Sequence, residues 1–142
     1  MSKIFHLVYV SHAVEDISYT DIRDILEVSR KHNAKENITG VLVFREGYFL
    51  QVLEGNKDAI LPLVDRIRDD DRNFKLKVLV ETESENRIFG EWSMAFLDGD
   101  IQANSTKDLI ELFEICLKGG ISDRTMIMIM ARKFRASAPE FK

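Results

Sequence analysis

The stretch VLVFREGYFLQVLEG, residues 41–55, decides the fold. Two runs of aliphatic and aromatic residues flank Arg45-Glu46-Gly47, and the glycine there supplies the backbone freedom that a tight turn needs. We therefore predict a hairpin whose two strands are residues 41–44 and 48–53. Gln51 stands in the middle of the second strand, on the face of Phe49 and Leu53, where period-two alternation calls for an apolar side chain.

Strands and helices alternate on both sides of this hairpin. Three further stretches share its bias to β-branched and aromatic residues and are predicted strands: 4–10, 76–80 and 91–97. Ser18 begins a helix that we expect to end at about Asn33, and a second helix follows residue 55. Pro62 removes a backbone donor near the first turns of that helix, so we expect its start to be late or bent. The order β-α-β-β-α-β-β predicts an α+β fold with both helices on one face of the sheet.

After residue 98 the pattern becomes helical. Ser105 begins a helix that Gly119-Gly120 ends, and Ser122 begins a last segment whose basic end favours a helix over a strand. We expect one structural unit, in which residues 1–98 form the sheet domain and residues 99–142 a helical extension packed on the other face. A partner subunit would cover that apolar face equally well, which leaves a homo-oligomer open.

The composition limits the classes of function. The chain has 142 residues, 45% of them hydrophobic and 31% charged, which suits one globular domain with its own core. A single cysteine excludes an internal disulfide and fits the cytoplasm. Twenty Lys and Arg are scattered among 24 Asp and Glu, and no apolar run approaches the thickness of a bilayer. We therefore expect neither nucleic acid nor a membrane as a partner.

Motifs for catalysis and metal binding are missing from the sequence. The three histidines have no metal-ligand spacing with Cys116, and there is no Gly-rich phosphate loop and no G-x-S-x-G elbow. No nucleophile stands beside a general base. We expect no metal site and no enzymatic activity.

Polar residues at apolar positions mark a candidate site. Tyr9, Asn33 and Gln51 lie where the pattern predicts a core, and burying an unpaired polar group costs about 1–3 kcal/mol. Each has a plain explanation: Tyr9 as a core tyrosine with a satisfied hydroxyl, Asn33 as a helix cap, Gln51 as an amide bonded to its neighbours. Each could also contact a ligand, and the residues alone leave both explanations open.

Five other candidates carry the same ambiguity. Arg66 and Asp70 form either an exposed helical ion pair or a set of polar groups aimed at a ligand. Ser29 lies on the buried stripe of its helix and could bond back to that helix. Trp92 and Met94 share a strand face that belongs either to the core or to a pocket wall.

Taken together, these residues resemble the BLUF family, the sensors of blue light that use FAD, in its short single-domain form. The matching pieces run in order over about residues 3–98: LVYVS at 7–11, HN at 32–33, ITGVL at 38–42, FLQVLEG at 49–55, RI at 66–67, DDR at 70–72, RIF at 87–89 and WSM at 92–94. No single piece is specific, but their order and spacing are. Asn73 stands where the family often has histidine, which leaves FAD against FMN open.

The resemblance implies a ferredoxin-like sheet whose first two helices hold a flavin ring. By this analogy Ile25 and Ile67 lie on the two faces of the ring, and Asn33 binds its carbonyl and imide edge. Arg66 and Asp70 contact the other polar edge, and Arg72 lies toward the phosphates. Two further residues lie beside the ring: Ser29 and His32.

The resemblance also implies a function. Tyr9 would give an electron to the light-excited flavin, with a proton passing through Gln51, whose hydrogen bonds are left rearranged. Trp92 and Met94 would carry the signal to an unidentified downstream protein that acts in trans, or to an effector domain of a longer chain of which this sequence is a part. Two rivals remain: a flavin enzyme, which would need groups for a second substrate, and an interaction domain without cofactor, which would be colourless.

Overall fold

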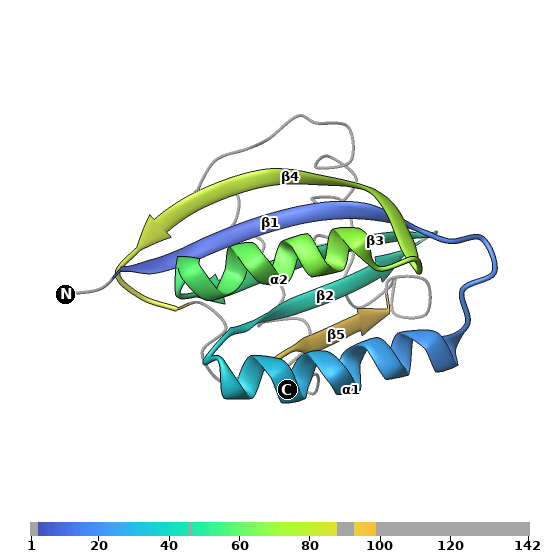
Figure 1. The fold of residues 1–142 in the computed structure, drawn as a ribbon, viewed down its shortest axis with the longest axis horizontal. Helices are drawn as coiled ribbons and strands as arrows, with labels where there is room; N and C mark the ends of the chain where they lie inside the picture. Colours follow the sequence, from blue (N-terminus) through green and yellow to red (C-terminus); the bar gives the residue numbers. More distant parts are fainter. Residues whose placement is uncertain (1–2, 46, 88–92, 99–142) are drawn as a thin grey trace.

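The hairpin predicted at residues 41–55 forms the middle of a five-stranded sheet. The computed structural model describes residues 3–45, 47–87 and 93–98. Its elements are β1 (Ile4–Ala13), α1 (Tyr19–Lys35), β2 (Thr39–Arg45), β3 (Tyr48–Gly55), α2 (Lys57–Asp69), β4 (Asn73–Ser84) and β5 (Ala95–Asp98) (Figure 1). The predicted β-α-β-β-α-β-β order is confirmed, and the fold is ferredoxin-like.

The strands lie in the order β4-β1-β3-β2-β5. β1 pairs antiparallel with both β3 and β4, β2 pairs antiparallel with β3, and β5 runs parallel to β2. In the ladder between β1 and β3, Tyr9 lies opposite Gln51 and His6 lies opposite Glu54. Because side chains alternate between faces, these two pairs lie on opposite faces of the same two strands.

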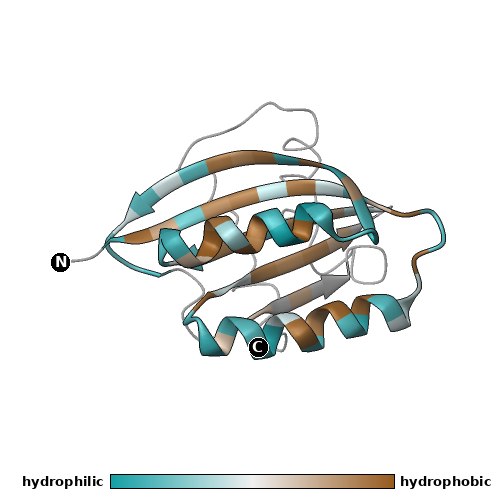
Figure 2. Cartoon of the chain, in the orientation of Figure 1, coloured by the Kyte–Doolittle hydropathy of each residue, from teal (hydrophilic) through white to brown (hydrophobic). Residues whose placement is uncertain are grey.

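Both helices cover one face of the sheet (Figure 1), and their buried residues pack with Phe5, Leu7 and Tyr9 of β1 in one core. Hydrophobic and hydrophilic residues alternate along each helix (Figure 2), as the amphipathic pattern predicts. Ser18 and Asp21 form a capping box at the start of α1. The expected late start of α2 is wrong, because Asn56 caps the amide of Asp58 at 2.8 Å and fixes the start ahead of Pro62.

The end of α1 differs from the prediction. The helix continues to Lys35, so Asn33 lies inside it and is buried rather than capping it. The left-handed residue after the helix is Asn37, with φ of 56°. The cap explanation for Asn33 is therefore wrong, and its buried amide needs another partner.

The opposite face of the sheet is also buried, as the side chains of Val8, Leu50 and Val52 show. The predicted C-terminal helices, and the domain boundary at residue 98, concern residues 99–142, which lie outside the described residues.

Within β2, Gly40 is required by a close approach of two backbones: a Cβ added there would lie 1.9 Å from the carbonyl oxygen of Val52.

Candidate functional site

A cavity of about 240 Å³ opens between α1 and α2, above β1 and β3. This volume is several times the roughly 30 Å³ that one water molecule occupies, so the cavity has the size of a ligand site rather than of a packing defect. Its lining comes from both helices and from the strands beneath: Tyr9, Ser11, Ile25, Val28, Ser29, His32, Leu42, Phe49, Gln51, Leu63, Arg66, Ile67, Asp70, Arg72 and Asn73.

The floor of the cavity carries a buried chain of polar contacts. The hydroxyl of Tyr9 donates to Oε1 of Gln51 at 2.5 Å, and Nε2 of Gln51 lies 3.3 Å from the sulfur of Met94, to which it donates. The antiparallel register brings Tyr9 and Gln51 together, because they are directly opposed on neighbouring strands. The Gln51 amide thus has its oxygen toward Tyr9 and its nitrogen toward Met94.

The electrostatic setting keeps Tyr9 protonated. Burial raises the pKa of the Tyr9 phenol well above its ordinary value of 10.0, and the negative charge of Asp70 raises it further. Tyr9 is therefore a neutral phenol in a short hydrogen bond to the amide oxygen of Gln51.

The rim of the cavity joins the two helices. Nη2 of Arg66 lies 2.6 Å from Nε2 of His32, and Nδ1 of His32 lies 3.4 Å from Oδ1 of Asn33. Because a guanidinium only donates, Nε2 of His32 is the acceptor of the Arg66 contact, and Nδ1 is the nitrogen placed to donate to Asn33. The amide nitrogen of Asn33 in turn donates to the carbonyl of Ser93 at 3.0 Å.

The inner end of the cavity is polar. The guanidinium of Arg72 donates two hydrogen bonds to the carboxylate of Asp70, at 3.0 and 2.6 Å. These bonds lower the pKa of Asp70 against the opposing effect of its partial burial, and Asp70 raises the pKa of Arg72. An ion pair of Arg66 with Asp70 was one of the two explanations that the sequence left open; in the structure Arg66 contacts His32 and Asp70 contacts Arg72 instead.

Most residues predicted for the site line this cavity: Tyr9, Ile25, Ser29, His32, Gln51, Arg66, Ile67, Asp70 and Arg72. Asn33 is buried behind the rim, where it bonds to Ser93. Met94 is buried against Gln51. Trp92 lies outside the described residues.

Sequence reasoning did not select six of the lining residues: Ser11, Val28, Leu42, Phe49, Leu63 and Asn73. Spacing could have found several of them. Ser11 and Phe49 lie two residues from Tyr9 and Gln51 on the same strand faces, and Leu63 precedes Ile67 by one helical turn. Val28 left no such signal, because it projects from α1 with 66% of its surface exposed.

Two buried oxygen atoms of residues that line the cavity indicate what kind of ligand would fit there. Oγ of Ser11 and Oδ1 of Asn73 belong to residues that line the cavity, and both atoms are buried without a hydrogen-bond partner among the described residues. Buried polar atoms are normally paired, so these two call for polar groups of a ligand. Ile25 and Ile67 supply apolar surface on the two helices. The residues therefore fit a planar ring with apolar faces and polar edges.

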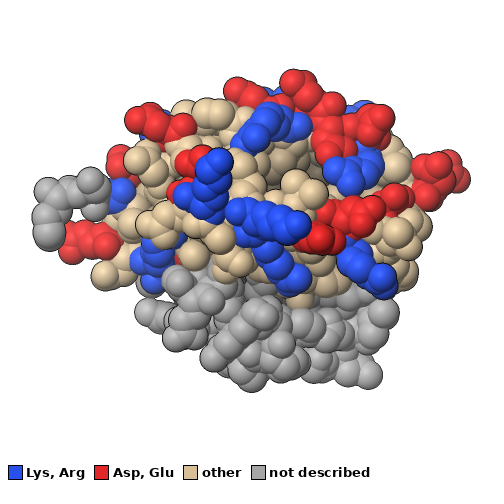
Figure 3. All heavy atoms as spheres, turned by 60° about the horizontal axis from the view of Figure 1, so that its bottom comes forward, with Lys and Arg blue, Asp and Glu red and all other residues tan. Residues whose placement is uncertain are grey.

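Other kinds of site find no support in the part of the chain that the structure describes. It contains no cluster of three or more His, Cys, Asp or Glu side chains able to hold a metal ion. No helix within it is both long and apolar enough to cross a membrane. On the face shown in Figure 3, basic and acidic side chains lie intermingled.

Comparison with known proteins agrees with this geometry. The family described as sensors of blue light using FAD, BLUF, matches residues 4–95. The β subunit of the photoactivated adenylate cyclase of Euglena gracilis is 35% identical over 89 residues, which are 62% of this chain and 10% of that protein. The chain thus spans about a tenth of the length of that curated relative.

Solved structures extend the likeness. The dark-state structure of the BLUF protein BlrB superposes with a TM-score of 0.80 at 25% identity, over 96% of this chain and 98% of that one. BlrP1 of Klebsiella pneumoniae, solved with FMN and cyclic diGMP, gives a TM-score of 0.70 at 25% identity, over 94% of this chain and 35% of that one. With its family match, fold and cavity in agreement, the chain belongs to the BLUF family, the sensors of blue light that use FAD.

Proposed function

We propose that this chain is a blue-light photoreceptor that holds an oxidised flavin without a covalent bond and switches through Tyr9 and Gln51. One observation carries the proposal. The hydroxyl of Tyr9 donates to the amide oxygen of Gln51 at 2.5 Å on the floor of a ligand-sized cavity. An amide has a donor end and an acceptor end on one group, so it offers two discrete hydrogen-bond arrangements.

The flavin ring would lie between Ile25 and Ile67, with Asn33, Arg66 and Asp70 at its polar edges. Ser29 and His32 would lie beside the ring, and Arg72 toward the phosphate end. The orphaned oxygens of Ser11 and Asn73 support a ligand with hydrogen-bond donors at the inner end of the cavity. FAD is the cofactor in the family's description, and FMN, present in the BlrP1 structure, is the alternative.

A bound flavin would supply the absorption of blue light and an acceptor for one electron. Tyr9 supplies that electron and releases the proton of its hydroxyl to Oε1 of Gln51, the acceptor already in place. Electron and proton later return to Tyr9, so the net redox change is zero. Gln51 is left with its donor and acceptor ends exchanged, which gives its surroundings a different hydrogen-bond pattern.

The rearranged Gln51 would signal through Met94, whose sulfur accepts from the Gln51 amide. Met94 immediately precedes β5, at the edge of the sheet. We propose that Trp92 belongs to the same output and that a downstream protein reads it in trans. Residues 1–98 would form the flavin-binding domain and residues 99–142 its helical extension. The fused cyclase of Euglena gracilis represents the other arrangement, with sensor and effector in one chain.

The visible spectrum before and after a blue flash tests the proposal. The expected result is a yellow protein with a small red shift that reverses in the dark. Tyr9→Phe should bind flavin but lose the shift, because phenylalanine has no proton to give. A normal photocycle in Tyr9→Phe would refute the switch. Failure to bind flavin after reconstitution would refute the sensor, and steady flavin reduction by a nicotinamide donor would favour the enzyme.

A further inference from the structure

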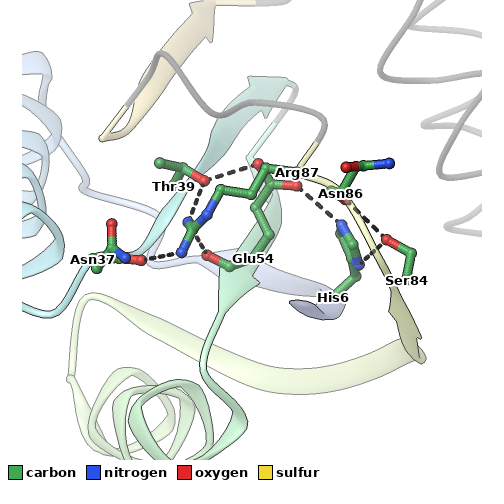
Figure 4. Close-up of polar contacts among 7 residues, drawn as sticks. All are labelled: His6, Asn37, Thr39, Glu54, Ser84, Asn86 and Arg87. Atoms are coloured by element: carbon green, nitrogen blue, oxygen red, sulfur yellow. Dashed lines mark hydrogen bonds and ion pairs between the residues drawn. The ribbon is translucent and has the colours of Figure 1, made fainter. Parts of the chain in front are cut away.

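A second buried polar cluster lies on the sheet face opposite the cavity, at the end of the same strands (Figure 4). Its centre is the Glu54 side chain, which has no exposed surface. Oε1 of Glu54 accepts from the hydroxyl of Thr39 at 2.8 Å, and Oε2 lies 3.1 Å from Nε2 of His6. The His6 contact is close enough for an ion pair but lacks the geometry of a hydrogen bond. A buried carboxylate has to be compensated in this way.

Arg87 closes the cluster at its outer side. One guanidinium nitrogen donates to the Thr39 hydroxyl at 2.8 Å and to the backbone carbonyl of Glu54 at 3.2 Å. The other donates to the backbone carbonyl of Asn37 at 2.7 Å. Figure 4 shows the guanidinium between these groups. The planar guanidinium is a fork of donors that can bond to several acceptors in different directions at once. A lysine ammonium would act on the same acceptors only as a point charge.

These contacts place Arg87 in relation to Met94. Two side chains of α1 hold the chain at residues 93–94: Arg30 donates to the carbonyl of Met94 at 2.9 Å, and Asn33 donates to the carbonyl of Ser93 at 3.0 Å. Residues 30–39, the end of α1 and the start of β2, thus contact the chain at both residue 87 and residues 93–94. Arg87 itself does not line the cavity.

We propose that Arg87 is a positioning residue for Met94: it ties Asn37 and Thr39 to the end of β3, which fixes the end of α1, and α1 in turn holds Met94 with its sulfur against the Gln51 amide. The contact of the Met94 sulfur with the Gln51 amide is present in the structure. The effect of Arg87 on the photocycle rests on the proposed function. Loss of the fork removes the three hydrogen bonds that Arg87 donates and loosens the connection between α1 and β2. Met94 then loses its fixed place beside Gln51.

Methyl NMR tests the positioning without light. The full chain carries five methionines, and Met94→Leu identifies the Met94 signal. Arg87→Ala should shift or broaden that signal, and the control Arg68→Ala, on the exposed side of α2, should leave it in place. Should Arg87→Ala fail to fold, Arg87→Lys keeps the charge without the fork and should move the signal in the same direction. An unmoved Met94 signal in the folded variants would overturn the proposal.

Dark recovery of the flavin-loaded protein is the second readout. Because a Gln51 hydrogen bond of the resting state is weakened, Arg87→Ala should slow the return roughly three- to tenfold, the range of one neutral hydrogen bond. In a Met94→Leu background the same substitution should change the rate less than twofold, because the two act in series. An equal slowing in both backgrounds would contradict the role of Met94. Absence of a red shift in the wild type refutes the proposed function instead and leaves the NMR result to decide the role of Arg87.

Discussion

Replacing both members of the Tyr9–Gln51 pair should cost less stability than the sum of the single replacements. Tyr9→Phe leaves Oε1 of Gln51 buried without its donor, and Gln51→Met leaves the Tyr9 hydroxyl buried without its acceptor. Each single variant should lower the free energy of unfolding by about 1–3 kcal/mol, the cost of an unpaired buried polar group. The double variant removes both polar groups together, so it leaves neither of them buried without its partner.

The coupling between the two sites is therefore expected to be about 1–3 kcal/mol, with the double variant close to or above the better single variant. Urea unfolding of the flavin-free protein measures it, because bound ligand would add its own stabilisation. With a slope of about 2 kcal/mol per molar urea, each single variant moves the midpoint by roughly 0.5–1.5 M. The control Tyr48→Phe alters a half-buried tyrosine and should change the free energy by less than about 0.5 kcal/mol. Additive losses at Tyr9 and Gln51 would refute the reasoning.

Three further predictions follow from single features. Gly40→Ala should destabilise the chain by about 3 kcal/mol or more in the same assay, because its Cβ would lie 1.9 Å from the Val52 carbonyl; wild-type stability would contradict the packing of β2 on β3. Since the pKa of Tyr9 is raised above 10.0, its stabilising effect is complete below pH 10 and lost above it, so the urea midpoint of Tyr9→Phe should fall less steeply than wild type above pH 10. Arg72→Gln should return the lowered pKa of Asp70 toward 3.8, which carboxyl NMR measures; an unchanged pKa would show that Arg72 is not its cause.

Local patterns predicted the strands that are buried, but not the full length of β4. Lys75, Lys77, Glu81 and Glu83 confine the aliphatic-rich stretch to residues 76–80, and Lys75 adopts a left-handed φ of 53°. β4 is an edge strand of the sheet that the described residues form, and an edge strand tolerates these charges. A rule based on enrichment in aliphatic and aromatic residues therefore finds only its central part.

The functional site was likewise predicted only in part from the sequence. Tyr9 and Gln51 were visible as polar residues in apolar strands, and the helical period placed Ile25 and Ile67 inward. The partner of Asn33 was not predictable, because Ser93 lies 60 residues further along the chain. The contact of Arg66 with His32 likewise depends on how two helices are arranged above the sheet. Such pairings come from tertiary packing, which periodicity does not encode.

The two polar pairs of the β1–β3 ladder also have a consequence for folding. Tyr9–Gln51 and His6–Glu54 face opposite sides of the sheet within one register. A slip of one residue would turn every side chain of one strand to the other face, and would bury the Glu54 carboxylate among the apolar residues beneath the helices. Misaligned hairpins therefore meet a desolvation penalty that the native alignment avoids. The His6–Glu54 pair, on the face opposite the proposed light switch, would thus help the nascent chain to reject incorrectly paired sheets.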